Sequence, residues 1–237
     1  MKKLVVLSGA GMSADSGLKT FRDSGGLWEG HDVMQVASPE AYARNPELVL
    51  EFYNQRRRQL QTAVPNAGHR ALASLESHFE VSIVTQNVDD LHERAGSTQV
   101  IHLHGELLKV RSTGPQKTVY PWKEDLHSED RCEAGYPLRP HIVWFGEPVP
   151  LLEEAANLTR QADMLLVVGT SMQVYPAASL IHYRRQGVPL YFVDPKPNLS
   201  PGDLDHLEIL PERAAVGLPI LANRLVDTAY GSGQPNP

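Results

Sequence analysis

Residues 4–13 read Leu-Val-Val-Leu-Ser-Gly-Ala-Gly-Met-Ser, an apolar run that passes directly into a glycine-rich turn. A short, continuous apolar run of this kind is typical of a strand buried on both faces of a sheet. Glycines after a first strand let the backbone approach a phosphate, so the turn is a candidate pyrophosphate site. The next glycine, Gly17, is six residues on, so the spacing is not the Gly-x-Gly-x-x-Gly fingerprint, and a plain strand-to-helix turn is an equally good interpretation.

The rest of the chain alternates apolar runs with segments of helical pattern. We predict further strands over residues 81–85, 100–103, 107–110, 142–145, 164–168 and 190–193. We predict helices beginning at Ser38-Pro39 and Asn45-Pro46 and running from Asn66 to His78, and others over residues 151–162, 177–186 and 216–226. This alternation predicts an α/β fold with a mostly parallel, Rossmann-like sheet and helices on both faces.

The composition limits the classes of function. The chain has 237 residues, a formal net charge of -6 and a single cysteine, Cys132. An acidic chain without a long basic run is a poor nucleic-acid binder, and no segment reaches the roughly 20 apolar residues that span a bilayer. A single thiol suits a reducing compartment, so we expect a cytoplasmic protein. We also expect a monomer that binds neither nucleic acid nor membrane.

Polar residues cluster just after three of the predicted strands. They are Gln86 to His92, the triplet Gly169-Thr170-Ser171, and Asp194. Open α/β sheets bind ligands at the carboxyl ends of their strands, although the same residues could simply cap helices. A carboxylate at Asp194 could accept ribose hydroxyls and would repel a 2′-phosphate, which favours NAD over NADP.

A pair of histidines, His102 and His104, lies in or beside a predicted strand and shares one face of it. Two histidines are too few to hold a metal and no cysteine lies near them. The alternative is one catalytic and one structural histidine, because imidazole is the natural general base near neutral pH.

Together these pieces resemble one family, the sirtuins, over nearly the whole chain from Lys3 to Val226. The matching motifs, in family order, are Gly9-Ala10-Gly11-x-Ser13, Thr20-Phe21-Arg22-Asp23, Thr85-Gln86-Asn87-x-Asp89-x-Leu91-His92, His104-Gly105, Pro140-x-x-Val143-Trp144-Phe145-Gly146-Glu147 and Gly169-Thr170-Ser171. The combination is specific, although each motif alone is not.

The resemblance implies a single catalytic domain with three parts. The large Rossmann-like part would take residues 1–30, 80–105 and 140–228, a helical insert residues 31–79, and a small module residues 106–139. Residues 229–237 would form a disordered tail.

The resemblance also implies NAD as co-substrate and an acyl-lysine protein or peptide as partner. The implied cofactor-binding residues are Gly9, Ala10, Gly11, Ser13, Phe21, Arg22, Gln86, Asn87, Val88, Asp89, Gly169, Thr170, Ser171, Asp194 and Ala214. The implied catalytic residues are His104, as general base on a ribose hydroxyl, and Asn87. The implied peptide-binding residues are Val143, Phe145, Gly146, Glu147, Val174 and Tyr175. The products would be nicotinamide, O-acyl-ADP-ribose and free lysine.

One departure concerns zinc. The small module of a sirtuin normally carries two pairs of cysteines, but this chain has Ser112 where a first cysteine is expected and keeps only Cys132. One thiolate cannot hold a tetrahedral zinc, so we expect no structural metal. Packing of Tyr120, Trp122 and Tyr136 is one way to order the module instead.

Tyr53 and Arg56 lie three residues apart on a predicted helix and therefore share a face. An arginine can hold a carboxylate through two parallel hydrogen bonds, and a tyrosine hydroxyl can add a third. The pair resembles the Tyr-x-x-Arg of the bacterial-type sirtuin subgroup that removes succinyl and malonyl groups. Taken without that resemblance, the pair is better read as a solvated arginine and a tyrosine packed on the core.

Three alternatives remain open at this point. The chain could mainly transfer ADP-ribose to protein or hydrolyse NAD, since the first half-reaction is shared. It could be a non-catalytic NAD or ADP-ribose sensor, although that would not need His104 or the Asn87/Asp89 pair. A Rossmann dehydrogenase is disfavoured by the glycine spacing.

Overall fold

The computed structural model describes residues 1–19, 27–28 and 31–230. Phe21, Arg22 and the tail from Gly231, on which three of our predictions fall, lie outside the described residues. Among the described residues, no helix is long and apolar enough to cross a membrane.

The central feature is a parallel sheet of six strands, in the order β11-β10-β9-β1-β4-β5. Its strands are β1 (Lys3–Ser8), β4 (Glu80–Thr85), β5 (Val100–His102), β9 (Met164–Val168), β10 (Leu190–Val193) and β11 (Leu207–Leu210). The predicted parallel sheet is confirmed. Strand β11 was not predicted, because each of its residues is only half-buried and so carries a weak apolar signal.

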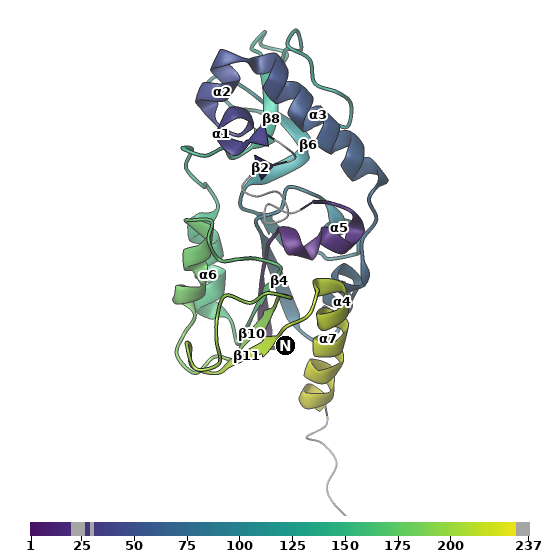
Figure 1. Cartoon of the computed structure of the whole chain (residues 1–237), viewed down its shortest axis with the longest axis vertical. Helices are drawn as coiled ribbons and strands as arrows, with labels where there is room; N and C mark the ends of the chain where they lie inside the picture. Colours follow the sequence, from purple (N-terminus) through teal and green to yellow (C-terminus); the bar gives the residue numbers. More distant parts are fainter. Residues whose placement is uncertain (20–26, 29–30, 231–237) are drawn as a thin grey trace, which may run out of the picture.

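Helices cover both faces of this sheet (Figure 1). On one face α4 (Ala67–Leu75) and α7 (Ala214–Tyr230) pack together over a core that includes Leu72 and Leu218. On the other face α6 (Leu152–Gln161) and the 3₁₀ helix η4 (Ala177–Tyr183) pack over a core that includes Ala155 and Leu180. Helix α4 therefore packs on the large sheet, although the three-part division proposed from the sequence placed its residues in the helical insert.

A second unit lies beyond the carboxyl ends of the parallel strands (Figure 1). Its antiparallel sheet has the order β7-β6-β8, with β6 (Gly105–Ser112), β7 (Val119–Pro121) and β8 (Leu138–Ile142). The helices α1 (Val33–Val36), α2 (Pro39–Arg44) and α3 (Pro46–Thr62) pack against it. The short elements that remain are η1 (Ala10–Met12), η2 (Ala14–Ser16), β2 (Leu27–Trp28), β3 (His31–Asp32) and α5 (Leu91–Arg94).

Several boundaries differ from those predicted. Helix α7 runs from Ala214 to Tyr230, so it is longer than the helix expected over residues 216–226 and includes residues 229–230 of the expected tail. The strand expected over residues 142–145 is wrong in position: β8 spans Leu138–Ile142, and in the turn that follows it Glu147 accepts a hydrogen bond from the Trp144 N–H. Helix α4 ends at Leu75 rather than at His78. The segment after Pro176 forms a 3₁₀ helix that ends at Tyr183.

The small module is ordered by a buried amide on α3. The Asn54 side chain donates to the Leu126 carbonyl (3.0 Å) and accepts from the Leu126 N–H (2.9 Å). Arg57, also buried, donates to the Asn54 Oδ1 (2.7 Å) and to the Leu107 carbonyl (3.2 Å). Hydrogen bonds from α3 thus hold the loop at Leu126 and strand β6 against the helix.

Aromatic side chains contribute to the same module. Tyr120 and Trp122 pack against a small core of Leu50, Val110, Leu126 and Leu138. Tyr136 is 42% exposed, yet its ring lies so close to Gly114 that a Cβ there would come within 2.5 Å of it.

Replacing Asn54 by alanine should destabilise the protein, because the Leu126 N–H and carbonyl would be left buried without partners. Each such group costs about 1–3 kcal/mol. Urea unfolding measures the loss. The control is Gln55→Ala, which removes an exposed amide from the same helix and should change the free energy of unfolding little. Equal losses of unfolding free energy in the two variants would contradict a stabilising role of the Asn54 hydrogen bonds.

Candidate active site

The candidate site lies where the parallel strands end at their carboxyl side. Ser8 of β1 is paired with Thr85 of β4 and with Val168 of β9, so the three strands end at the same level of the sheet. The residues that follow are Gly9, Gln86 and Gly169. The structure therefore brings together three motifs that are distant in the sequence, as expected for an open α/β sheet.

The turns after β1 and β9 meet backbone to backbone. The Gly11 N–H donates to the Gly169 carbonyl at 2.8 Å. A Cβ at Gly11 would lie 2.8 Å from the Gly169 Cα, and a Cβ at Gly169, where φ is +60°, would lie 2.2 Å from the Met12 nitrogen. Gly11 therefore requires glycine for space, and Gly169 requires it for both space and backbone conformation.

A buried polar network lies beside this contact. The Asn87 amide donates to the Gly9 carbonyl (3.1 Å) and to the Ser13 Oγ (3.3 Å), and the Ser13 hydroxyl donates to Asp89 (2.9 Å). Burial raises the pKa of Asp89, against the hydrogen bonds from Ser13 and the Leu91 N–H. Asn87 and Asp89 are thus positioned by the glycine turn, and Val88 between them is half-buried.

The two histidines contact successive carbonyls of the strand β4 extension. His104 Nδ1 lies 3.1 Å from the Gln86 oxygen, and His102 Nδ1 lies 3.0 Å from the Asn87 oxygen. A carbonyl only accepts, so Nδ1 of His104 carries the proton and its Nε2 keeps a lone pair. Burial lowers the pKa of His104, with the bond to Gln86 opposing. His104 is therefore a neutral base near neutral pH.

The segment after β8 borders His104. The Val143 N–H donates to the His104 carbonyl at 2.9 Å, and the Phe145 N–H donates to the Ala37 carbonyl at 3.0 Å. Gly146 has φ of +88°, which turns the chain back toward β8. Phe145 is exposed, as are Val174 and Tyr175 of the segment before η4.

Glu147 has its carboxylate occupied by protein groups. It accepts from Arg139 (2.7 and 3.0 Å), from Arg111 (2.9 and 3.1 Å) and from the Trp144 N–H (2.8 Å). These bonds lower its pKa although burial acts to raise it. The carboxylate therefore shapes the loop that carries Val143 and Phe145.

The remaining predicted residues lie on either side of these motifs. Thr170 accepts from the Gln86 side chain (3.3 Å) and Ser171 follows it. Asp194, which follows β10 and is buried, accepts from the Lys196 N–H (2.9 Å). Ala214 begins α7 and is also buried, with its carbonyl in close contact with Gly68.

Tyr53 and Arg56 lie on α3. Tyr53 is fully buried, and its hydroxyl oxygen accepts from the Trp144 Nε1–H at 2.9 Å. The Arg56 guanidinium lies 3.6 Å from the centre of the Phe52 ring and donates to the Phe52 carbonyl at 2.6 Å. Burial raises the pKa of Tyr53, so the phenol is protonated at neutral pH.

Two residues of this region were not singled out from the sequence. Asn66, expected only as a helix cap, also donates to the Met12 carbonyl at 2.9 Å and so ties α4 to the glycine turn. Glu93 lies 2.7 Å from His102 Nε2. No local sequence signal reveals either contact, because each joins segments that only the tertiary fold brings together.

The residues of the small module do not fit a tetrahedral zinc. Cys132 has Ser112 as its neighbour, with the hydroxyl 3.3 Å from the sulfur. The residues that the structure describes contain no cluster of three or more histidine, cysteine or acidic side chains able to hold a metal. A serine hydroxyl is a poor substitute for a zinc-bound thiolate.

Comparison with known proteins places these features in context. The model of the Sir2 family matches residues 9–176. A protein of Helicobacter pylori (strain J99) named NAD-dependent protein deacylase is 60% identical over 196 residues, covering 83% of this chain and 84% of that protein. A protein of the same name from Bacteroides thetaiotaomicron is 53% identical over 203 residues, covering 83% of this chain and 87% of that protein.

Solved structures agree with the fold. A Sir2 homologue in complex with ADP-ribose has a TM-score of 0.88 at 38% identity, covering 99% of this chain and 95% of that one. A Sir2 homologue in complex with NAD has a TM-score of 0.86 at 38% identity, covering 96% and 91%. A Sir2 protein bound to an acetylated peptide has a TM-score of 0.76 at 29% identity, covering 95% and 92%.

Replacing Gly169 by alanine should destabilise the turn contact far more than replacing Gly17, which also has a positive φ (+88°) but has no atom within 4 Å of its Cβ position. Conformational strain alone costs about 1–2 kcal/mol at either site. Urea unfolding of both variants isolates the excess due to the close approach. Equal losses would show that the two turns can separate freely.

Proposed function

This chain belongs to the Sir2 family, and from that premise we propose that it is an NAD-dependent protein-lysine deacylase that prefers short acidic acyl groups such as succinyl and malonyl. The observation that carries the proposal is a neutral His104 hydrogen-bonded to the carbonyl of Gln86, the residue directly before Asn87 of the Asn87–Ser13–Asp89 network. A binding module for NAD would not need a base with a free lone pair at this place.

The proposed NAD site follows this edge. The bare backbone of the turns at Gly9 to Ser13 and at Gly169 to Ser171 supports close approach of a pyrophosphate. Asn87 and Asp89, held by the glycine turn, would face the nicotinamide ribose and carboxamide, with Gln86 and Val88 beside them. Asp194 and Ala214 would contact the adenosine half. Phe21 and Arg22 complete the proposed set.

In the proposed reaction the acyl oxygen of the substrate attacks the ribose carbon that carries nicotinamide, and nicotinamide leaves. His104 Nε2 then removes a proton from a ribose hydroxyl, which attacks the acyl carbon. With one water consumed, the products are nicotinamide, O-acyl-ADP-ribose and lysine. The fixed Nδ1–H bond to the Gln86 carbonyl supports this role, because it keeps the lone pair on Nε2.

The acyl-lysine peptide is proposed to lie along the Val143–Glu147 loop, opposite Val174 and Tyr175, as an added strand. The exposure of Phe145 and Tyr175, 42% and 71%, supports a contact surface there. The Val143 carbonyl would accept the substrate amide N–H. Glu147 would act by holding the loop through Arg111 and Arg139.

The acidic-acyl preference rests on Tyr53 and Arg56. Because indole N–H only donates, the Tyr53 oxygen is the acceptor in its bond with Trp144, and burial keeps the phenol protonated at neutral pH. Arg56, one helical turn away, adds a guanidinium that can bind a carboxylate through two bonds. This arrangement supports recognition of a succinyl or malonyl tip.

One lysine peptide in acetyl and succinyl forms, incubated with enzyme and NAD, should yield free lysine peptide and O-acyl-ADP-ribose, detected by mass spectrometry. Turnover should fall at acidic pH only below about pH 6.5, because the neutral form of His104 is active and burial lowers its pKa from that ordinary value. His104→Ala should bind NAD and not turn over. ADP-ribosylated protein as the main product, or NAD binding without turnover by the unaltered enzyme, would contradict the proposal.

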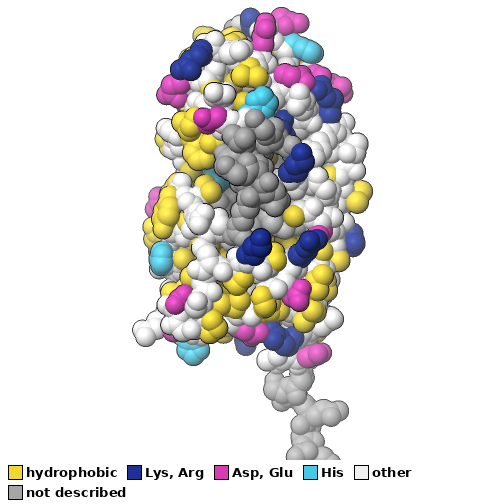
Figure 2. Space-filling view, viewed as in Figure 1, with side chains coloured by type: hydrophobic (Ala, Val, Ile, Leu, Met, Phe, Trp, Pro, Cys, Tyr) yellow, Lys and Arg dark blue, Asp and Glu magenta, His cyan; other side chains and the backbone are white. Residues whose placement is uncertain are grey.

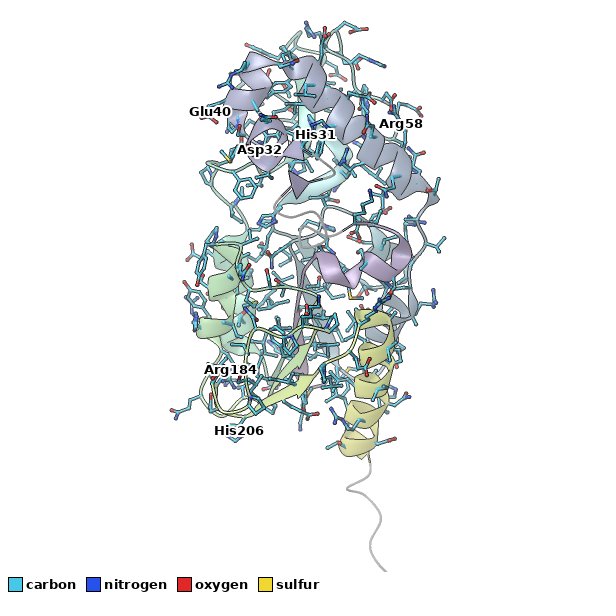
Figure 3. The ribbon with its side chains drawn as sticks, viewed as in Figure 1. His31, Asp32, Glu40, Arg58, Arg184 and His206 are labelled. Carbon is cyan, nitrogen blue, oxygen red and sulfur yellow. The ribbon has the colours of Figure 1, made fainter. Side chains whose placement is uncertain are left out.

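Replacing Arg56 by methionine should lower kcat/KM for the succinyl peptide by about 10- to 100-fold and leave that for the acetyl peptide nearly unchanged, since only the succinyl tip carries a charge. The control is Arg58→Met, on the outer side of the same helix (Figure 3), where the guanidinium pairs with Glu51 and Asp125. The preference for acidic acyl groups is contradicted if Arg56→Met affects both peptides alike.

A further inference from the structure

His102 has both ring nitrogens in contact with acceptors. Nδ1 lies 3.0 Å from the Asn87 carbonyl oxygen, and Nε2 lies 2.7 Å from Glu93 Oε1. The His102 side chain is 7% exposed, so solvent does not compete strongly for either nitrogen. A neutral imidazole has a single N–H and cannot donate to both.

Two protonation states could satisfy this geometry. Either His102 is an imidazolium beside a carboxylate, or a protonated Glu93 donates to a neutral ring. The Glu93 side chain is 40% exposed, which favours its charged form. Burial acts to raise the pKa of Glu93, but the bond and the charge of His102 lower it overall. The imidazolium–carboxylate pair is therefore the consistent state.

Other charged and titratable groups also lie near His102. Glu106 on β6 raises the pKa of His102, and Asp89 interacts with the positive ring. His92 on α5 is neutral, since burial lowers its pKa to about 3. Lys109 pairs with Glu106 at 2.6 Å and also interacts with Glu93.

The net direction for His102 is the opposite of that for His104. Burial lowers the pKa of His102, but the hydrogen bond and charge of Glu93 outweigh burial and raise it above its ordinary value. The surroundings of His102 and His104 therefore shift the pKa values of the two imidazoles in opposite directions, so that of His102 favours the cation and that of His104 favours the neutral base.

The Asn87 carbonyl that His102 holds belongs to a residue with a second anchor. The Asn87 amide reaches across to the Gly9 carbonyl and to Ser13. We propose that His102 is a positioning residue, kept as an imidazolium by Glu93, whose Nδ1–H fixes the Asn87 backbone so that the amide stays directed at the NAD site. The kinetic test of this role rests on the proposed function, because it measures kcat/KM for NAD.

Loss of one proton from His102 at alkaline pH has a specific consequence. The carboxylate at 2.7 Å strongly favours retaining the Nε2–H, so the proton that leaves is the one on Nδ1. The Nδ1 lone pair then faces the Asn87 oxygen, and two acceptors repel. Asn87 would loosen as the pH rises through the raised pKa of His102.

The decisive variant is Glu93→Gln. A glutamine amide can donate to Nε2, so a neutral His102 keeps its proton on Nδ1 and its bond to Asn87 at every pH. We expect wild-type kcat/KM for NAD to fall at alkaline pH and the Glu93→Gln profile to fall less, so that the variant exceeds wild type there. His102→Phe should lose ~10-fold at all pH values, because the bond is absent throughout.

The matched control is Glu106→Gln, the same chemical change at a carboxylate that is not hydrogen-bonded to His102, and it should keep the alkaline fall. The protonation state is read directly by ¹⁵N NMR of His102, which should show both ring nitrogens protonated at neutral pH. Parallel profiles of wild type and Glu93→Gln, an unchanged kcat/KM in His102→Phe, or a neutral His102 ring would overturn the proposal. Absence of any wild-type turnover would contradict the proposed function instead, and the NMR result would still decide the state of His102.

Discussion

The site depends on one close approach, that of the turn after β1 to the turn after β9. The bond from the Gly11 N–H to the Gly169 carbonyl (2.8 Å) joins the two central strands just beyond the sheet. Because no side chain lies between them, Ser13 comes within reach of Asn87 and Asp89 on the β4 extension. A wider gap would separate the groups proposed to hold NAD from the base proposed to act on it.

The neighbourhood of that contact keeps two chemically equal side chains in different states. His104 and His102 both donate from Nδ1 to consecutive carbonyls, but Nε2 of His102 meets Glu93. Burial without a charged partner favours the neutral ring, and burial with a carboxylate favours the cation. The environment, rather than the residue type, therefore favours a base at His104 and a positioning role at His102.

Charged and polar hydrogen bonds connect the segments of the small module. Asn54 and Arg57 on α3 hold the loop at Leu126 and the strand at Leu107, and Glu147 holds Arg111 and Arg139 across the antiparallel sheet. The order of the module thus comes from hydrogen bonds between segments distant in the chain.

Basic, acidic and apolar side chains are interspersed over the face shown in Figure 2, without a single basic stripe.

The sequence by itself determined the parallel sheet, because continuous apolar runs such as Leu4 to Leu7 are buried on both faces, and it determined the motifs at the strand ends. It also determined the lack of zinc ligands, since that needs only a count of cysteines. Only the tertiary structure decided the contacts of Asn54, Asn66 and Glu93, the edge strand β11 and the two acceptors that face His102. Local patterns record burial and turns, whereas a hydrogen bond between distant segments, and the protonation that it imposes, exists only after the chain has folded.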